Sequence, residues 1–238
     1  DGGDIRFVDA DNSTLLKYHF EKWTYNGDSW IWVKVPQIDG GSATDHVWLY
    51  YGNGGATGIE DEANTYDANF MGVWHLKETT GGSGAIKDST ANGNDGTDSG
   101  SPGLGVTGKI GNAIDFDGTD DSVTIPDSDS LDLANGLTIE AWIYIYTWVD
   151  WEDIVFKGGG AADNSDYQFA LVSTGLMWDG TLAGAWRTKD FSTTTDTGEW
   201  IYVAVTHDTT TVRCYMAGSQ IGSQSDAGNI YESTYQLG

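Results

Sequence analysis

The chain has 238 residues, of which 36 are acidic and 11 are basic, so its formal net charge is -25. A charge this negative repels phosphate groups, which excludes nucleic acids and anionic membrane surfaces as partners. No apolar run approaches the ~18 residues of a membrane-spanning helix, which excludes membrane insertion. With 33 Gly, 3 Pro and 13% aromatic residues, the composition is typical of a turn-rich β protein.

Alternation of apolar and polar residues predicts strands along most of the chain, beginning in the first 55 residues. There the alternation covers residues 16–21, 30–35 and 47–51. Residues 56–71 lose it and are rich in Ala, Thr, Asn, Asp and Glu. We therefore expect a small β module over residues 1–55 and a linker over residues 56–71.

Beyond residue 72 the predicted strands are short and follow one another at intervals of about ten residues, and no segment has the 3.6-residue period of a helix. The longest is 137–146, where Glu140, Trp142 and Tyr144 share the face opposite the aliphatic residues. A glycine-rich loop is expected at 81–111. The other predicted strands are 73–76, 113–116, 122–125, 154–156, 167–172, 176–178, 200–206 and 212–216. This pattern predicts an all-β fold, a jelly-roll sandwich over residues 72–238.

Several motifs resemble a known family. Residues 112–125, Asn-Ala-Ile-Asp-Phe-Asp-Gly-Thr-Asp-Asp-Ser-Val-Thr-Ile, resemble the opening of a laminin-G-like, concanavalin-A-like domain. Segments 137–143, 154–158 and 200–206 resemble later strands of that domain, in the family's order. The first 55 residues resemble an uncharacterised β module that is often joined to such domains in archaeal and bacterial surface proteins. The resemblance implies a jelly roll in an extracellular or cell-surface protein.

Both ends of the chain depart from the family pattern. The usual first strands of the β module are missing before Asp1, and the closing strand of the sandwich is missing after Gly238. A sandwich without its closing strand exposes unpaired N–H and C=O groups. We therefore expect a strand from a neighbouring copy, or from a longer chain, to fill this edge.

The sequence does not favour catalysis. Glycoside hydrolases of this fold place carboxylates at alternate positions of one strand, because those positions lie on one face. Here Glu140 is followed on its face by Trp142 and Tyr144, so no acid pair forms. The four histidines are scattered and form no metal or nucleophile motif. We expect the chain not to be an enzyme.

Two oxygen-rich loops are candidate calcium sites, because calcium is bound by carboxylate, amide and carbonyl oxygens. The candidate ligands are Asp88, Asn92 and Asn94 in the first loop, and Asp117, Asp120 and Asp121 in the second. Laminin-G-like domains often bind calcium, so the resemblance also implies a site. Two alternatives remain open: the acids are solvated turn residues, or the whole surface is adapted to high salt.

Three tryptophans in or beside predicted loops are candidate sugar-binding residues: Trp148, Trp151 and Trp186. A flat indole can stack on the apolar face of a sugar ring, while Asp and Asn bind its hydroxyls. The alternative is that they cap the edges of the sandwich. The leading hypothesis is an extracellular, calcium-organised module that binds glycans or glycosylated surfaces. The alternative function is a structural subunit of a surface filament, sheath or virion fibre, in which copies of the chain associate.

Overall fold

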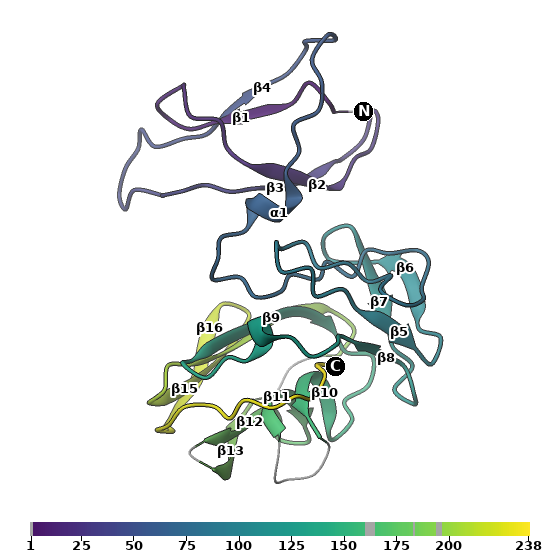
Figure 1. Cartoon of the computed structure of the whole chain (residues 1–238), viewed down its shortest axis with the longest axis vertical. Helices are drawn as coiled ribbons and strands as arrows, with labels where there is room; N and C mark the ends of the chain where they lie inside the picture. Colours follow the sequence, from purple (N-terminus) through teal and green to yellow (C-terminus); the bar gives the residue numbers. More distant parts are fainter. Residues whose placement is uncertain (1, 160–164, 183, 194–196) are drawn as a thin grey trace. The chain divides into compact units, whose positions relative to one another are not determined.

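The computed structural model describes residues 2–159, 165–182, 184–193 and 197–238 (Figure 1). The fold is all-β, as the sequence predicts. The chain forms two compact units. The N-terminal unit contains residues 1–95 and 103–115, and the C-terminal unit contains residues 96–102 and 116–238.

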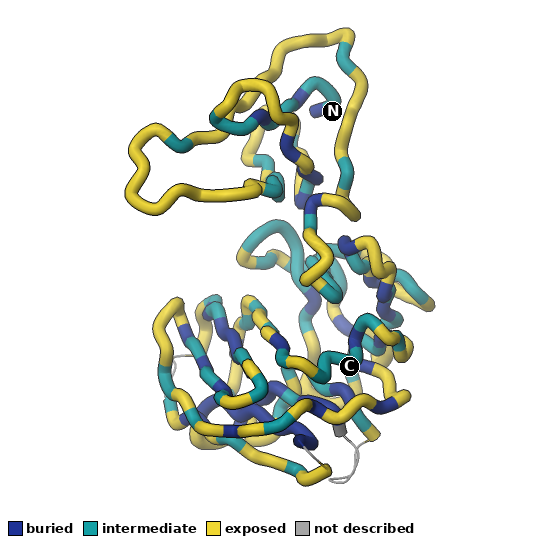
Figure 2. The backbone as a smooth tube through the Cα atoms, turned by 60° about the vertical axis from the view of Figure 1, so that its left-hand side comes forward, coloured by how far each residue is buried: buried dark blue, intermediate teal, exposed yellow. Residues whose placement is uncertain are grey.

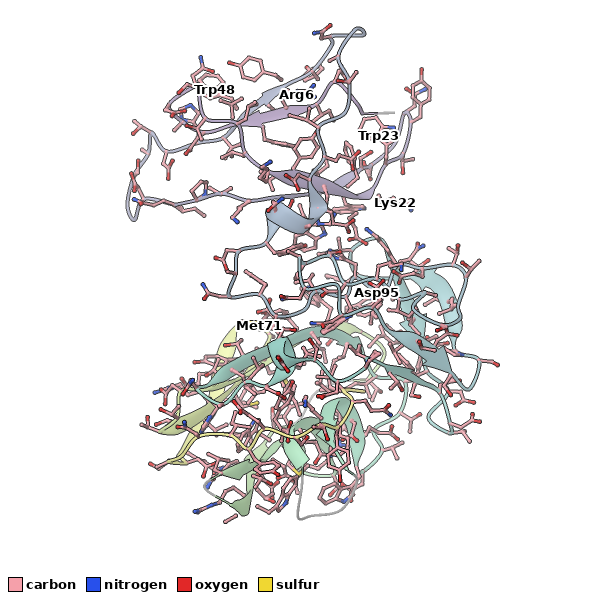
Figure 3. The ribbon with its side chains drawn as sticks, viewed as in Figure 1. Arg6, Lys22, Trp23, Trp48, Met71 and Asp95 are labelled. Carbon is pink, nitrogen blue, oxygen red and sulfur yellow. The ribbon has the colours of Figure 1, made fainter. Side chains whose placement is uncertain are left out.

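The N-terminal unit is built from three antiparallel strand pairs and one helical turn. The pairs are β1 (Arg6–Val8) with β4 (Trp48–Tyr50), β2 (Tyr18–Lys22) with β3 (Trp30–Val33), and β6 (Gly103–Thr107) with β7 (Asn112–Asp115). Figure 3 labels Arg6 and Trp48 on the first pair. The helical turn is α1 (Glu62–Thr65). No helix among the described residues is long and apolar enough to cross a membrane.

Tyr18 forms the centre of the N-terminal unit's core and is completely buried. Its ring contacts the rings of Phe7 and Phe20, with centroids 5.3 and 5.8 Å away. Its hydroxyl donates a hydrogen bond of 2.8 Å to the carbonyl of Ile5, which satisfies the polar end of a buried aromatic side chain.

The C-terminal unit contains two four-stranded antiparallel sheets. The first has the order β10 (Glu152–Gly158), β11 (Ser165–Val172), β12 (Gly175–Leu182) and β13 (Ala185–Ser192). The second has the order β16 (Ser219–Ser225), β15 (Thr211–Met216), β14 (Trp200–His207) and β9 (Leu137–Tyr144). A separate pair joins β5 (Thr97–Ser99) to β8 (Ser122–Thr124).

The core of this unit lies between the two sheets. Trp178 of β12 stacks on His207 of β14, with ring centroids 5.2 Å apart and ring planes inclined by 14°. Along β9, buried or half-buried residues alternate with exposed ones, whereas β12 is buried along its whole length. Figure 2 colours the backbone by burial and shows buried and exposed stretches along the C-terminal unit. The alternation of β9 is the one that its sequence predicts, because successive side chains of a strand point to opposite faces.

A buried lysine joins several parts of the sandwich. The Lys157 ammonium on β10 is within 3.1 Å of carboxylate oxygens of Asp127, Asp132 and Asp166, and 2.9 Å from the carbonyl of Ser233. The side chain is fully buried. Burial opposes its charge, but the hydrogen bonds that the ammonium donates to the three carboxylates raise the pKa of Lys157.

The C-terminal residues occupy the edge that we expected to be open. Leu237 exchanges two backbone hydrogen bonds with Ile125, and Gly238 exchanges two with Phe156 of β10. Leu237 and Gly238 therefore lie between the end of β8 and β10, and pair with both. At these positions the backbone N–H and C=O groups of the sheet are satisfied within the chain.

The structure differs from the predicted strands in the middle of the chain. Residues 73–76 form no strand, and only Trp74 makes an isolated bridge, to Asp88. The expected loop at 81–111 contains β5 and β6. The alternation also misses β13 and β16, because these outer strands carry many polar residues on both faces.

The compact units also differ from the domain limits expected from the sequence, which were residues 1–55, 56–71 and 72–238. Residues 56–71 contain α1 and lie within the N-terminal unit, as do residues 72–95. Long-range contacts such as the hydrogen bond from Ser89 to Glu62, 2.7 Å long, hold these segments together. Such contacts leave no local signal in composition.

Candidate functional site

Five aromatic side chains lie next to one another on β9, β14 and the residues that follow β9. We call this surface the aromatic ladder, and its members are Trp142, Tyr144, Tyr146, Trp200 and Tyr202. The first three are 42%, 37% and 67% exposed, and the last two are half-buried. Aromatic residues gathered on a surface in this way are typical of a binding site.

Strand register places the rings of the ladder in contact. Trp142 pairs with Tyr202 and Tyr144 pairs with Trp200 across β9 and β14. Cβ atoms of directly opposed residues are about 5 Å apart, so their side chains meet. The ring centroids are accordingly 5.5 Å and 5.6 Å apart, and Tyr144 also contacts Tyr146 at 5.0 Å.

The carboxylate of Glu140 adjoins the ladder on the same face. Glu140 is exposed and lies two residues before Trp142 on β9. The hydroxyl of Tyr202 donates a hydrogen bond to Glu140 Oε2. Burial, together with the hydrogen bond and the charge of Glu140, raises the pKa of Tyr202 to about 12. Tyr202 therefore stays protonated at neutral pH and keeps donating to this carboxylate.

The structure does not bring the three predicted tryptophans together. Trp148 is half-buried, and its Nε1 donates a 2.8 Å hydrogen bond to the carbonyl of Val172 at the end of β11. Trp186 pairs with Thr181 towards the other end of β12. Because Val172 pairs with Gly175, about 20 Å of strand separates the two positions.

Trp151 differs from the other two. Its side chain is 62% exposed, and its φ of 65° lies in the left-handed region that non-glycine residues seldom adopt. It stands at the end of the loop that connects Tyr144, the last residue of β9, to β10. Of the predicted sugar-binding residues, Trp151 alone is both exposed and held in a strained conformation.

The second predicted calcium loop brings its three carboxylates together. Asp117, Asp120 and Asp121 each have an oxygen within 4.8 Å of the others. Calcium binds oxygens at 2.3–2.6 Å, so oxygens with these separations can share one ion. Gly100 faces the loop, where a Cβ would lie 2.5 Å from the carbonyl oxygen of Asp120. The three carboxylates are the type of donor that calcium prefers.

The first predicted calcium loop has a different arrangement. The Asp88 carboxylate accepts hydrogen bonds from the backbone of Val73, Thr90 and Asn94, and from the Thr90 hydroxyl. Asn92 and Asn94 both donate side-chain hydrogen bonds to the carbonyl of Met71. The two Asp88 oxygens are thus engaged by protein donors, which brace the loop. The first loop stays a prediction, and the second loop is the one whose carboxylates converge.

The sequence of residues 117–237 matches the family model of the concanavalin A-like lectin/glucanases superfamily. The chain belongs to this superfamily. Residues 1–76 match a domain of unknown function, DUF2341. No curated protein sequence matches the chain.

Two solved structures are similar to part of this chain. The binding domain of Paraclostridial Mosquitocidal Protein 1 is similar with a TM-score of 0.52 and 18% identity, over 65% of this chain. The chain spans 41% of the length of that structure. Domain 4 of AbnA, an extracellular GH43 arabinanase from Geobacillus stearothermophilus solved with arabinotriose, has a TM-score of 0.48 and 22% identity, over 63% of this chain and 75% of the other. At 18% identity, the likeness to the first of these structures shows the fold alone.

Sequence reasoning did not identify the aromatic ladder as a site. The alternation along residues 137–146 placed Trp142, Tyr144 and Tyr146 on the polar face, and that placement is confirmed by their exposure. Three aromatic residues on the solvent-facing side of this segment are a sequence pattern that could have predicted a binding surface. What the sequence lacks is the pairing with Trp200 and Tyr202, which lie some 60 positions further along the chain.

Proposed function

We propose that the C-terminal unit is a non-catalytic glycan-binding module and that the aromatic ladder is its contact surface. The observation that carries this proposal is the exposure of two aromatic residues on one face of β9 and of Tyr146 just beyond its end, with two more aromatic residues paired across the sheet. Flat aromatic faces offer apolar area to sugar rings, while Tyr hydroxyls and Glu140 offer hydrogen bonds. Membership of a lectin and glucanase superfamily supports a carbohydrate as the ligand.

The arrangement of β9 favours binding over hydrolysis. Hydrolysis of a glycosidic bond by this fold uses two carboxylates placed on one face. On β9 the two positions after Glu140 on its face are Trp142 and Tyr144. The strand therefore offers aromatic surface where a glycosidase would offer a second acid.

The proposal also includes a bound calcium ion and an extracellular or cell-surface location. Asp117, Asp120 and Asp121 would hold a calcium ion, whose role is to fix the loop between β7 and β8. The resemblance to laminin-G-like surface proteins supports an extracellular or cell-surface setting for such a module.

A glycan array tests the function. The whole chain is expected to bind a subset of immobilised glycans, and Trp142→Ala is expected to lose that binding. Trp48→Ala is the matched control, because Trp48 is 44% exposed on β4 in the other unit. Loss of one indole contact of about 100 Å² weakens binding by about 60-fold, or about 2.5 kcal/mol. Equal loss of binding in both variants, or no binding by the whole chain, contradicts the proposal.

One observation favours the alternative, a structural subunit. The β4 strand is exposed at all three of its positions and pairs only with β1 among the described strands, and Trp48, Leu49 and Tyr50 are each more than 40% exposed. Exposed apolar edge strands pair readily with strands of other chains. If this function holds, light scattering should show that the wild-type chain assembles as its concentration rises. Leu49→Lys should suppress this assembly.

A further inference from the structure

The charges around the aromatic ladder restrict the class of glycan that it can bind. The C-terminal unit contains 20 acidic residues and four basic ones. Three of the four basic side chains are already paired: Lys157 with three aspartates, Lys189 with Asp226 at 3.6 Å, and Arg213 with Asp208 at 2.6 Å. The fourth, Arg187, lies on β13 in the other sheet.

An acidic sugar would therefore meet unfavourable electrostatics at the ladder. Binding of a uronate, sialate or sulfate group is strongest where a cation replaces the water that the group loses. The basic residues of the unit are either engaged by carboxylates or carried by the other sheet. The surrounding excess of carboxylates repels an anion further.

The ladder instead has the components of an ammonium site. A cation is attracted to the faces of Trp and Tyr rings, most strongly when a carboxylate lies nearby. Here Glu140 is exposed on the same face as Trp142 and Tyr144. The Tyr202 hydroxyl bonds to one of its oxygens, and a carboxylate can accept further hydrogen bonds.

We propose that the ladder binds a glycan chain that bears free amino groups, a polymer or oligomer of amino sugars. An ammonium group would lie against Glu140 and the Trp142 and Tyr202 rings, and the following rings would stack along Tyr144 and Tyr146. Residues on one face of a strand recur about every 6.7 Å, so the ladder suits an extended chain more than a single sugar. This inference rests on the proposed glycan-binding function and adds its substrate class.

Four hexamers separate this inference from the function on which it rests. Three share a β-1,4 backbone and differ at carbon 2: the glucosamine hexamer, the N-acetylglucosamine hexamer and cellohexaose. The fourth is a galacturonic acid hexamer. Titration calorimetry at about pH 6 is carried out at low salt and at about 0.5 M NaCl, where the Debye length shortens to roughly 4 Å.

We expect the glucosamine hexamer to bind at least tenfold more tightly than cellohexaose at low salt, and the difference to shrink at high salt. The galacturonic acid hexamer should bind most weakly. Equal affinity for the glucosamine hexamer and cellohexaose overturns the inference and leaves the glycan-binding function standing, as does tight binding of the acidic hexamer. Absence of binding by all four hexamers contradicts both.

Matched variants distinguish the site from the overall charge of the protein. Glu140→Gln is expected to reduce the preference for the glucosamine hexamer several-fold and to leave cellohexaose binding within a factor of two. Glu232→Gln removes one exposed charge outside the ladder and should preserve the preference. If Glu232→Gln reduces the preference for the glucosamine hexamer as much as Glu140→Gln does, the overall negative charge of the protein attracts the ligand, and the inference fails.

Discussion

Trp142 and Tyr202 lie opposite each other on β9 and β14, and their ring centroids are 5.5 Å apart on the solvent-facing side of the sheet. Aromatic pairs of this kind contribute about 0.5–1.5 kcal/mol beyond their burial. A double-mutant cycle with Trp142→Ala and Tyr202→Ala, measured by urea unfolding, is expected to give a coupling energy in this range. Strict additivity of the two substitutions would contradict the contact.

Removal of the buried cation should destabilise the sandwich strongly. Lys157→Met leaves three carboxylates converging on an uncharged side chain, with Asp166 itself buried. Loss of one partner from a buried ion pair costs about 3–5 kcal/mol, because the remaining charge is uncompensated. Lys87→Met is the control, since Lys87 pairs with Asp95 at the surface and such pairs contribute about 1 kcal/mol or less. Similar losses in both variants would refute the role of the cluster.

The N-terminal unit should lose stability in mild acid through His19. Its Nε2 lies 3.1 Å from the Tyr66 hydroxyl, which is 3.0 Å from Nε2 of His75. Burial lowers the pKa of His19 to about 4, against the opposing charge of Glu62. Since the pKa is about 6.5 in the unfolded chain, the unfolded state binds the proton first as the pH falls.

The contribution of His19 to stability is therefore complete above about pH 6.5 and is lost as the pH falls towards 4. The loss amounts to roughly 3 kcal/mol for a difference of about 2.5 pKa units. His19→Gln should remove this part of the pH dependence, whereas His46→Gln, at an exposed position, should retain it. Parallel stability profiles for the wild type and His19→Gln between pH 7 and 4 would disprove the prediction.

Asp179 on β12 should destabilise the sandwich at neutral pH. Its side chain is buried, and this burial raises the pKa of Asp179 to about 6. The charges of Asp190 and Asp153 also raise this pKa, and a hydrogen bond with Thr188 lowers it. The folded state then holds its proton more tightly than the unfolded state, so the cost is full above about pH 6 and vanishes below about 3.8. Asp179→Asn is expected to raise the free energy of unfolding at pH 7 by up to about 3 kcal/mol. An unchanged or lower value would show that the carboxylate is stabilised by other means.

Calcium should stabilise the protein beyond the effect of ionic strength. A ligand at about 100 times its Kd adds about 2.7 kcal/mol to the free energy of unfolding. The Tm should rise with calcium chloride and rise less with sodium chloride of equal ionic strength. Asp120→Asn should abolish the difference, because Asp120 supplies one oxygen of the cluster, and Asp28→Asn, at an exposed position, should not. Equal rises with both salts would favour screening of the -25 charge and adaptation to high salt.

The sequence by itself determined the all-β class and the two faces of residues 137–146, because a strand's period of two is a local property of its backbone. It also placed Asp117, Asp120 and Asp121 in one loop, since these residues are neighbours in the chain. Tertiary structure alone decided that Tyr202 faces Trp142, that Trp148 and Trp186 lie far apart, and that three aspartates surround Lys157. These relationships depend on which distant strands pair and in what register, and that choice is set by burial and backbone hydrogen bonding across the whole sheet rather than by any local pattern.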